Sequence, residues 1–596
     1  MSTSSSDSTT QVHAYIEMTS IFALPPHITP RNIFFNQYPT NTSALQTAGI
    51  LTPSVNVAME ISRIVLLFLF KVAIGALPLA YAQLYFLPES TPSYIREFRW
   101  PISYGIALVV YLIDQLVIYP RFRDPYRHLP SAKEHTPGEI IFESPRGKTP
   151  LKWMRKYPDA DLLRVDGAVG GPTLIPASAD ALRDLLNTNS YDFEKSWGVR
   201  AFLSRALGFG LILSEGAEHK RQRKALTPAF NIRKIRELYG LMWEKTNVLL
   251  TELGKQAPGT VDVTDWASRL TLDIIGPTAI GKDFNSLQTE GHPVAKAFEE
   301  LLEPRLDALI LLGAHWVIPE YILRRVPVKV NWDIDRITTF LRKECRQFVV
   351  DKHKELLDGK KIADTDILGA IMQTGDFTDD LLVDEMLTFL AAGHETTANA
   401  LTWVCYLCAH NPHVQEKLRA EIRATIPSAS SPITYDILEN MPYLNGVCEE
   451  TLRLYPTVPV TIRESIKDTH VAGVPIFRGT EFILIPFAIN RHPRFWGEDA
   501  DKIVPERWID TDKDGRQRPN KNGGTSTNFS EITFLHGPRA CIGRDFAKAE
   551  LRCAVAGVLG RFEIKPDTMK EPTITGVITM RAVGGIHLKF KELDGW

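Results

Sequence analysis

The feature that most constrains this chain is the ten-residue segment FLHGPRACIG at 534–543. A glycine and a proline precede Cys541 closely, and a helix-forming stretch, Asp545 to Val558, follows it. The segment therefore predicts a tight loop that presents a cysteine at the N-terminus of a helix, where exposed N–H groups favour a thiolate. Most lone cysteines are simply buried, but glycines on both sides of this one would let a flat ligand approach the backbone closely.

The same segment resembles the cysteine-loop signature of the cytochrome P450 family, F-x-x-G-x-R-x-C-x-G, at every specified position. The matching residues are Phe534, Gly537, Arg539, Cys541 and Gly543. The resemblance implies that Cys541 ligates the iron of haem b, that Arg539 pairs with a haem propionate, and that Phe534 screens the sulfur. A thiolate ligand donates electron density to the iron and so favours cleavage of the O–O bond of dioxygen.

A second motif lies in a long apolar stretch, Thr378 to His410, which we predict to be one helix ended by Asn411-Pro412. The sequence AGHETT at 392–397 places threonines mid-helix, where their hydroxyls can bond back to carbonyls four residues earlier. Alone, this motif would be a tolerated local defect. Together with the cysteine loop it resembles the oxygen-binding helix of the same family. The resemblance implies that Thr396 hydrogen-bonds the oxygen species on the iron and that Glu395 relays protons as a general acid.

Glu450 and Arg453 form an E-x-x-R pattern, which by itself usually means a surface ion pair on one helix face. The same spacing occurs at Glu218/Arg221 and at Glu416/Arg419. Context favours Glu450 and Arg453, because the sequence PERW at 505–508 resembles the P-E-R-F motif of the family. The resemblance implies that Arg507 joins this pair in a buried triad that holds the cysteine loop.

Two further arginines and a histidine are candidates for pairing with haem propionates, where charge-assisted bonds are favoured. Arg463 stands seven residues after Pro456, and Arg223 matches the second half of the family's W-x-x-x-R helix. His219 occupies the tryptophan position of that motif, which leaves open whether it also contacts a propionate. The neighbouring basic residues Lys220, Arg221 and Lys224 predict a solvated helix face, which could also dock an acidic electron donor.

The first 120 residues differ in character from the rest. Residues 1–60 are rich in Ser, Thr and Pro and predict a flexible N-terminal segment. The apolar run Ile64–Leu87 is close to the ~20 residues that cross a bilayer. A second run, Ile102–Tyr119, carries Asp114, an acid that is costly inside a membrane. We expect residues 61–120 to form a membrane anchor of one or two spans, the second run being either a span or an interfacial or re-entrant helix.

A proline-rich hinge is predicted at 121–137. Its basic residues are Arg121, Arg123, Arg127 and Lys133. By the positive-inside rule this side of the membrane is the cytosol, so the expected location is the endoplasmic reticulum with the catalytic domain facing the cytosol. The sequon at Asn41 would be glycosylated only if a single span places the N-terminus in the lumen.

The body, residues 138–596, has mainly helical periodicity with a few strand-like runs, at Leu162–Val165, Val471–Phe477 and Phe482–Ile485. We expect a mainly α fold with a small β-sheet, which by resemblance is the single-domain cytochrome P450 fold. The polar stretch 510–530 predicts a surface insertion. The net charge of −2 gives no broad basic surface for nucleic acid, and six cysteines in so long a chain give no disulfide framework.

The resemblance implies a haem-thiolate monooxygenase that puts one atom of O2 into a hydrophobic small molecule, either a fungal secondary metabolite or a lipid-like compound. No glycine-rich nucleotide loop is present, so electrons are expected from NADPH through a separate NADPH–cytochrome P450 reductase. Three alternatives stay open: a relative that rearranges or dehydrates its substrate without O2, a haem-binding sensor or carrier, and a membrane scaffold without haem. The sequence does not identify the substrate.

Some features near the site have a plainer interpretation. Cys405 and Cys408 predict core packing, because a metal site would need a second such pair. The apolar stretch Leu306–Ile318 is either a lid that touches lipid or a buried helix. Substrate contacts are expected near Met386, Phe389, Thr457–Ile462 and Thr573–Met580, whose side chains indicate only an apolar pocket.

Overall fold

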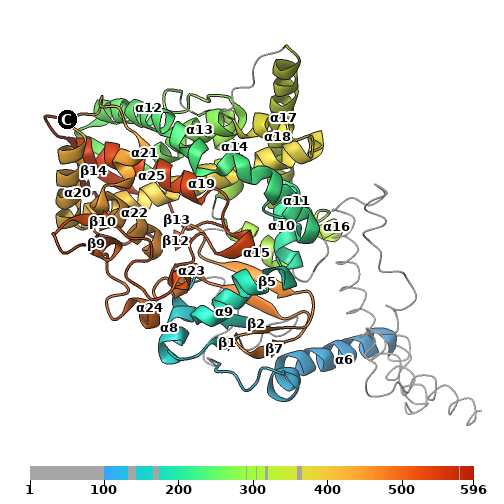
Figure 1. Ribbon diagram of the computed structural model, residues 1–596. Helices are drawn as coiled ribbons and strands as arrows, with labels where there is room; N and C mark the ends of the chain where they lie inside the picture. The colour runs from blue at the N-terminus through green and yellow to red at the C-terminus, as the bar shows by residue number, and fades with distance from the viewer. Residues whose placement is uncertain are drawn as a thin grey trace, which may run out of the picture. The chain divides into compact units, whose positions relative to one another are not determined.

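The computed structural model describes residues 99–131, 143–165, 173–289, 291–303, 305–315, 318, 320–358, 366–575 and 578–596. Helices dominate this part of the chain and the strands are short, as Figure 1 shows. The expected mainly α fold with a small β-sheet is therefore confirmed. The predicted flexible segment with Asn41, the first apolar run Ile64–Leu87, and Lys133 lie outside the described residues.

The helices follow one another through short connections. The first half of the body contains α8 (Lys148–Lys156), α9 (Ala179–Arg183), α10 (Trp197–Leu207), α11 (Gly216–Leu226), α12 (Ile232–Gln256), α13 (Val263–Ile280), α14 (Pro293–Leu302), α15 (Leu306–Ala314), α16 (Glu320–Leu323) and α17 (Lys329–Leu357). The second half contains α18 (Ile367–Met372), α19 (Asp379–His410), α20 (Pro412–Thr425), α21 (Tyr435–Glu439), α22 (Pro442–Leu454), α23 (Pro486–Ile489), α24 (Pro493–Trp496) and α25 (Arg544–Arg561).

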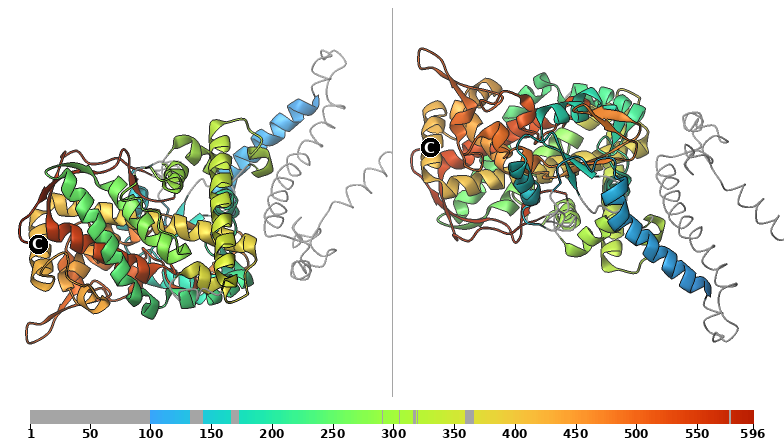
Figure 2. Two further views of the ribbon diagram at one scale, coloured as in Figure 1. Left: turned by 90° about the horizontal axis from the view of Figure 1, so that it is seen from above. Right: turned by 90° about the horizontal axis from the view of Figure 1, so that it is seen from below.

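Helix α19 is the long helix predicted around the AGHETT motif, and most of its side chains are buried. Thr378 caps its first turn by accepting a hydrogen bond from the N–H of Leu381, and it ends at Asn411 as expected. Helix α13 packs against it, and the two lie side by side in Figures 1 and 2. A Cβ at Gly393 would come within 2.8 Å of Ile275 of α13. This glycine therefore lets the two helices approach closely at the motif.

The largest sheet among the described strands has the order β1-β2-β8-β5-β3. Its strands are β1 (Leu162–Val165), β2 (Thr173–Pro176), β3 (Phe193–Glu194), β5 (Thr461–Ser465) and β8 (Glu481–Leu484). β2 and β8 are parallel and the other neighbours are antiparallel. Two of the three strand-like runs in the sequence correspond to β1 and β8, so those predictions are confirmed.

The third run, Val471–Phe477, was wrong as a single strand. It contains the end of β6 (Thr469–Val471) and all of β7 (Val474–Ile476), which pair as a hairpin. Ala472 and Gly473 between them have φ of 48° and 75°. Two successive positive φ values form the two-residue turn whose twist matches antiparallel strands. Hydrophobic periodicity did not reveal this turn, because its first position is an alanine rather than a typical turn residue.

A second sheet, of order β11-β14-β4, joins distant parts of the chain. Its strands are β4 (Gly259–Asp262), β11 (Phe562–Pro566) and β14 (His587–Glu592). Two further hairpins are β9 (Ile509–Thr511) with β10 (Gln517–Pro519), and β12 (Ile574–Thr575) with β13 (Arg581–Ala582). The β9–β10 hairpin lies in the polar stretch 510–530, where most side chains are exposed, as a surface insertion requires.

The second apolar run forms α6 (Arg99–Ile113) and a π-helical continuation, η1 (Asp114–Arg123). Large apolar side chains are exposed along α6, among them Val109 and Val110. Asp114 forms an ion pair with Arg123, so a cation accompanies the acid within this segment. Of the helices among the described residues, none combines the length and the apolar character that crossing a bilayer requires.

The described part of the predicted hinge contacts the main body. Tyr126 is buried; its hydroxyl lies 2.9 Å from Oγ1 of Thr480 and accepts a hydrogen bond from the N–H of Phe477. Asp124 forms a buried ion pair with Arg164 of β1 at 3.4 Å. The π-helical segment also continues to Arg123, so the first three residues of the predicted hinge are helical. These contacts fix it to the edge of the main sheet.

Candidate active site

The cysteine loop is closed by a backbone hydrogen bond from the N–H of Cys541 to the carbonyl of Phe534, 2.9 Å long. A 3₁₀ turn, η7 (Gly537–Arg539), precedes Cys541, and α25 begins at Arg544 just after it. Gly537 has a φ of +74°, and a Cβ there would overlap the carbonyl of Leu186. This glycine therefore sets the shape of the loop. The expected geometry, a cysteine at the N-terminus of a helix, is present.

Cys541 is the exposed cysteine of the chain; the other five, including Cys405 and Cys408 in the core of α19, are buried. The thiol is accessible but lies inside the protein body. Burial raises its pKa above the usual value, while the N–H of Gly543 and the guanidinium of Arg223 act in the opposite direction. A coordinating metal would remove the proton outright, and the two favourable groups would then stabilise the thiolate.

Two neighbours shape the space beside the sulfur. Arg223 of α11 donates a hydrogen bond of 2.6 Å to the carbonyl of Ala540 and so ties this helix to the cysteine loop. A Cβ at Gly543 would stand 4.0 Å from the sulfur and 4.0 Å from the ring of Phe230. The missing side chain leaves room next to the thiol. Phe230 in turn contacts Phe389 of α19, with ring centroids 5.5 Å apart.

A cluster of buried cations lies near the loop, formed by Arg539, Arg463 and Lys195. The described acid in contact with them is Glu215, whose carboxylate lies 2.6 Å from Arg539 and 3.7 Å from Lys195. Burial lowers the pKa of Lys195 to about 7 and that of Arg463 to about 10. The positive charge of the cluster exceeds the negative charge of Glu215. Such a cluster favours binding of additional carboxylates.

His219 of α11 is buried beside this cluster, and its Nδ1 lies 3.2 Å from the hydroxyl of Tyr191. Burial and the nearby Arg539 lower the pKa of His219 to about 4. The imidazole is therefore neutral at pH 7 and can exchange hydrogen bonds but does not carry charge. This differs from an arginine or lysine, which would pair electrostatically with a propionate.

These residues fit a haem group. The accessible thiol at a helix N-terminus is a suitable ligand for the haem iron. The space beside Gly543 suits the flat macrocycle, and the buried cations suit the two propionate groups of the haem. Cys541 would ligate the iron, and Arg539, Arg463 and Lys195 would pair with the propionates. Phe534 lies half-buried at the start of the loop, packed against the core; that it screens the sulfur stays a prediction.

The structure brings together Glu450, Arg453 and Arg507, the three residues expected to form a triad. Arg453 and Glu450 are fully buried and share two hydrogen bonds of 2.8 and 2.7 Å. Arg507 lies 3.5 Å from Glu450 and makes a shorter ion pair of 2.6 Å with Asp499. Trp508 adds a hydrogen bond of 3.0 Å from its Nε1 to Glu450. The alternative E-x-x-R sites differ: Glu218 and Arg221 form an exposed pair, and Arg419 donates to the carbonyls of Leu559 and Phe562.

Asn490 connects this buried cluster to the cysteine loop. Its Nδ2 donates to the carbonyl of Arg453 at 3.2 Å and to Oγ1 of Thr533 at 2.8 Å. Its Oδ1 accepts a bond of 2.9 Å from the N–H of Ile532. Arg453 itself donates to the carbonyl of Asn490. The pair in α22 is therefore linked by hydrogen bonds to the residues that directly precede Phe534.

Helix α19 remains α-helical through the motif at 392–397. The Oγ1 of Thr396 donates to the carbonyl of Ala392 at 2.6 Å, the back-bonding expected from the sequence. Glu395 is buried and accepts a hydrogen bond of 2.8 Å from Thr579. Burial raises its pKa to about 7, while Arg581, 3.6 Å away, acts in the opposite direction. At neutral pH this carboxyl is populated in both protonation states.

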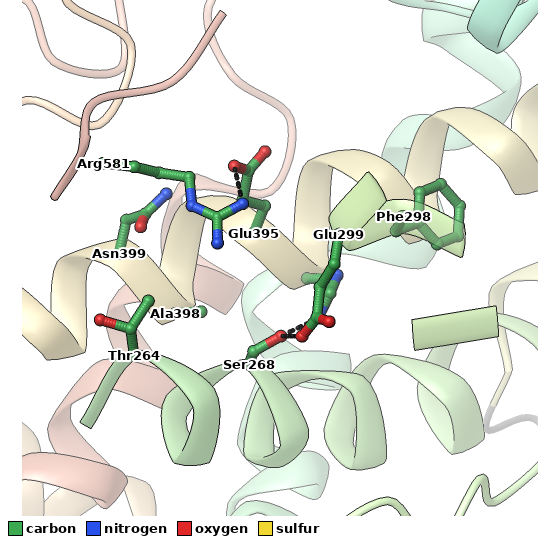
Figure 3. Close-up of a pocket in the computed structure, with 9 residues that line it drawn as sticks. Thr264, Ser268, Phe298, Glu299, Glu395, Ala398, Asn399 and Arg581 are labelled. Carbon is green, nitrogen blue, oxygen red and sulfur yellow. Dashed lines mark hydrogen bonds and ion pairs between the residues drawn. The ribbon is translucent and has the colours of Figure 1, made fainter. Parts of the chain in front are cut away.

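Glu395 faces a cavity of about 280 Å³, shown in Figure 3. Its lining comes from α13, α14, α19 and β13. The lining residues are Thr264, Ser268, Phe298, Glu299, His394, Glu395, Ala398, Asn399 and Arg581. Seven of these nine residues are polar or charged, so groups that can bind a water molecule stand around the cavity.

A second cavity, of about 580 Å³, is lined mainly by apolar side chains of α10, α14, α15 and α17 together with Ile578. Ile578 belongs to the predicted contact segment Thr573–Met580, whose Met580 N–H donates to the carbonyl of Thr457 in the other predicted segment, at 2.8 Å. Met386 and Phe389 are buried in α19. Helix α15 is only partly buried: Ala308 and Leu309 are buried, whereas Leu306 and Ile310 are exposed.

Several residues of the site were not predicted from the sequence. Lys195 and Glu215 flank no recognisable motif, although Glu215 stands four residues before His219. Arg581 lies one residue beyond a segment predicted to contact substrate. Glu299 and Ser268 had no signal, since they meet Glu395 only through the packing of α13 and α14 against α19.

Comparison with known proteins agrees with this geometry. The family model for cytochrome P450 matches residues 168–589. Similar curated proteins include cytochrome P450 monooxygenase sphH of Aspergillus fumigatus, 36% identical over 86% of this chain and 97% of its own length. ALT8 of Alternaria alternata is 32% identical over 88% of this chain and 99% of its own length, and FUM15 of Gibberella moniliformis is 32% identical over 82% and 92%. Both are also named cytochrome P450 monooxygenases. The chain therefore belongs to the cytochrome P450 family and is a monooxygenase of that family.

Proposed function

We propose that this chain uses haem b and O2 to insert one oxygen atom into a hydrophobic small molecule, a fungal secondary metabolite or a lipid-like compound. Its electrons come from NADPH through a separate NADPH–cytochrome P450 reductase. The protein is held at the endoplasmic reticulum membrane with its catalytic domain in the cytosol. The observation that carries the proposal is the accessible thiol of Cys541 at the start of α25, next to a buried cationic cluster.

When bound, haem supplies the binding and reductive cleavage of O2. The chain's own residues prepare the site for this chemistry. The N–H of Gly543 and the guanidinium of Arg223 stabilise negative charge on the sulfur of Cys541. Arg539 and Arg463 would hold the carboxylates of the group and so orient it, since buried cations bind carboxylates strongly.

Proton supply distinguishes a monooxygenase from a relative that only rearranges its substrate. Oxygen insertion with release of water consumes two protons, which must come from solvent. Glu395, with a pKa of about 7, is suited both to donate a proton and to recover one at neutral pH. The hydroxyl of Thr396 already donates to Ala392, so its oxygen is free to accept. This pair supports the monooxygenase over the rearranging alternative.

The substrate class follows from the apolar cavity of about 580 Å³ and from α15. Ala308 of α15 lines the cavity, while Leu306 and Ile310 of the same helix face outward. A helix that is apolar on both faces suits contact with a lipid surface outside and a hydrophobic compound inside. The similar monooxygenases come from fungi, which supports a fungal compound as substrate, and their names state no substrate.

The test is spectroscopic first and catalytic second. Reduced, carbon-monoxide-treated holoprotein should show the red-shifted band of a thiolate-ligated haem. Cys541→Ser should lose this band, whereas the control Cys345→Ala, a buried cysteine of α17, should keep it. Product formation that requires NADPH, reductase and O2 together supports the monooxygenase. A missing band, or turnover without O2, would overturn the proposal.

The membrane location has its own test, on the full chain expressed in a fungal host. Alkaline carbonate extraction should leave the protein in the membrane pellet, and its release into the supernatant would refute the anchor. Glycosidase digestion, with Asn41→Gln as the control, then separates the two topologies. A mass shift that is absent in the control indicates one span, and no shift indicates two.

A further inference from the structure

The cavity next to Glu395 is lined by charged groups that lie outside the AGHETT motif, among them Glu299 and Arg581. Figure 3 shows Glu299 and Ser268 together on one side of it and Arg581 with Glu395 on the other. Ser268 Oγ donates to Glu299 at 3.5 Å and lies 2.7 Å from Nε2 of His394. On the opposite wall, Arg581 is 3.6 Å from Glu395. Two carboxyls therefore face one polar cavity from different helices, α14 and α19.

The two acids differ in their access to solvent. Glu395 is 7% exposed and His394 is 2% exposed, so both lie in the interior. Glu299 is half-buried, and the side chain of Arg581 is 21% exposed. The cavity of about 280 Å³ thus leads from residues that reach solvent to a buried acid. Polar side chains on both sides of it provide hydrogen-bond partners for a water molecule, and water relays protons between groups that are too far apart for direct contact.

We propose that this cavity is the route by which protons from solvent reach Glu395, with Glu299 as the outer acid that exchanges them with bulk water. The inference rests on the proposed monooxygenase function, in which RH + O2 + 2e⁻ + 2H⁺ gives ROH + H2O. Both protons on the left are taken from solvent, and Glu395 returns to its protonated form after each transfer. Glu299 lies outside the motif at 392–397; it lines the same cavity as Glu395 and is linked to His394 through Ser268.

The charges around the cavity suit this role. Burial and Asp265 raise the pKa of Glu299, while Arg581, Ser268 and Arg269 act in the opposite direction. Burial raises the pKa of Glu395 to about 7, while Arg581, Thr579 and Asn399 act to lower it. Arg581 therefore lowers the pKa of both carboxyls and so favours the ionised form of each. His394 has a pKa of about 4, so it stays neutral and adds no charge to the route.

The test measures how fast Glu395 gains a proton, without substrate or reductase. In ferric holoprotein at alkaline pH, a light-released proton is followed by the infrared C=O band of the protonated carboxyl, which Glu395→Gln identifies by its loss. Glu299→Gln should slow the appearance of this band about tenfold or more, since a positioned acid typically contributes 10²–10⁴-fold to a proton transfer. The final amplitude should not change, because Glu299 is not among the groups that set the pKa of Glu395.

Two further variants serve as controls for the rate measured in Glu299→Gln. Glu299→Asp retains an exchangeable proton and should restore most of the rate. Glu237→Gln, an exposed carboxyl on α12, should match the wild type. An unchanged rate in Glu299→Gln, with a normal carbon-monoxide band to show that the protein is folded, would overturn the route. Failure of the proposed function itself would appear differently, as absent product in the wild type while the proton kinetics still depend on Glu299.

Discussion

Replacement of Arg453 by alanine should remove haem binding although Arg453 belongs to the interior of α22 rather than to the cysteine loop. Arg453 is fully buried, makes two hydrogen bonds to Glu450, and donates to the carbonyls of Asn490, Ala500 and Lys502. Removing one partner of a buried ion pair typically costs about 3–5 kcal/mol. Each buried carbonyl left without a donor adds roughly 1–3 kcal/mol.

These costs are partly offset because Glu450 keeps the N–H of Val504 and the indole N–H of Trp508 as donors. We therefore expect a net loss of about 5 kcal/mol, comparable with the whole stability of a typical domain, ~5–15 kcal/mol. The hydrogen bonds from Asn490 to Arg453 and Thr533 transmit the disruption to the residues before the cysteine loop. Haem incorporation should fall before the fold is lost completely.

Two measurements on purified protein check this prediction: the carbon-monoxide band per mole of chain and the urea midpoint of unfolding. The matched control is Arg221→Ala, which breaks a pair of the same E-x-x-R spacing, Glu218/Arg221, on the surface. An exposed pair of this kind contributes about 0.2–1 kcal/mol, so the control should keep its haem. If Arg453→Ala binds haem and unfolds at the same urea concentration as the control, the proposed role of the buried pair is refuted.

Three other expectations follow from single contacts. Gly537→Ala should destabilise the protein by about 1 kcal/mol or more beyond Gly515→Ala, because both glycines have positive φ but only a Cβ at 537 would overlap the carbonyl of Leu186; urea midpoints of the two variants test this. The folded-state pKa of Glu395, about 7, lies above the unfolded value of about 4.3, so ionisation of this carboxyl destabilises the fold increasingly as pH rises from about 4 to 7, by roughly 3 kcal/mol in total. Glu395→Gln should therefore unfold at higher urea than the wild type at pH 8 and at the same urea at pH 4. Tyr126→Phe should cost about 1–3 kcal/mol, because it leaves the N–H of Phe477 without its acceptor, and unchanged thermal unfolding would contradict that contact.

The parts of the site that depend on one short stretch of chain could be predicted from the sequence. Cys541 and its loop lie within ten residues, and Glu395 with Thr396 lies within one helical turn. Their chemistry follows from local geometry, namely a helix N-terminus and a mid-helix hydroxyl. Three E-x-x-R patterns occur in the sequence, and only the neighbouring PERW motif favours Glu450 and Arg453 over the other two. In the structure this pair is distinguished by its complete burial.

The remaining site residues become neighbours only through long-range packing. Lys195 contacts Glu215 although the whole of α10 separates them in the sequence, and Glu299 of α14 lines the same cavity as Glu395 of α19. The hydrophobic periodicity of the sequence does not predict contacts of this kind. Short strands were missed for a related reason: β3 and β13 contain two residues each, too few to show alternation, and they exist because a partner strand supplies their hydrogen bonds.

The sheet that joins β4 to β14 has a consequence for synthesis of the protein. Gly259–Asp262 pairs with residues near His587, so about 300 residues must be translated before β4 meets its partner. At ~5–20 residues per second this delay is roughly 15–60 s, during which the edge of β4 has no native strand to bond with. A ribosome stalled in this interval would expose a chain that is open to pairing with the wrong strand. Chaperone dependence should therefore fall sharply once the last strand emerges.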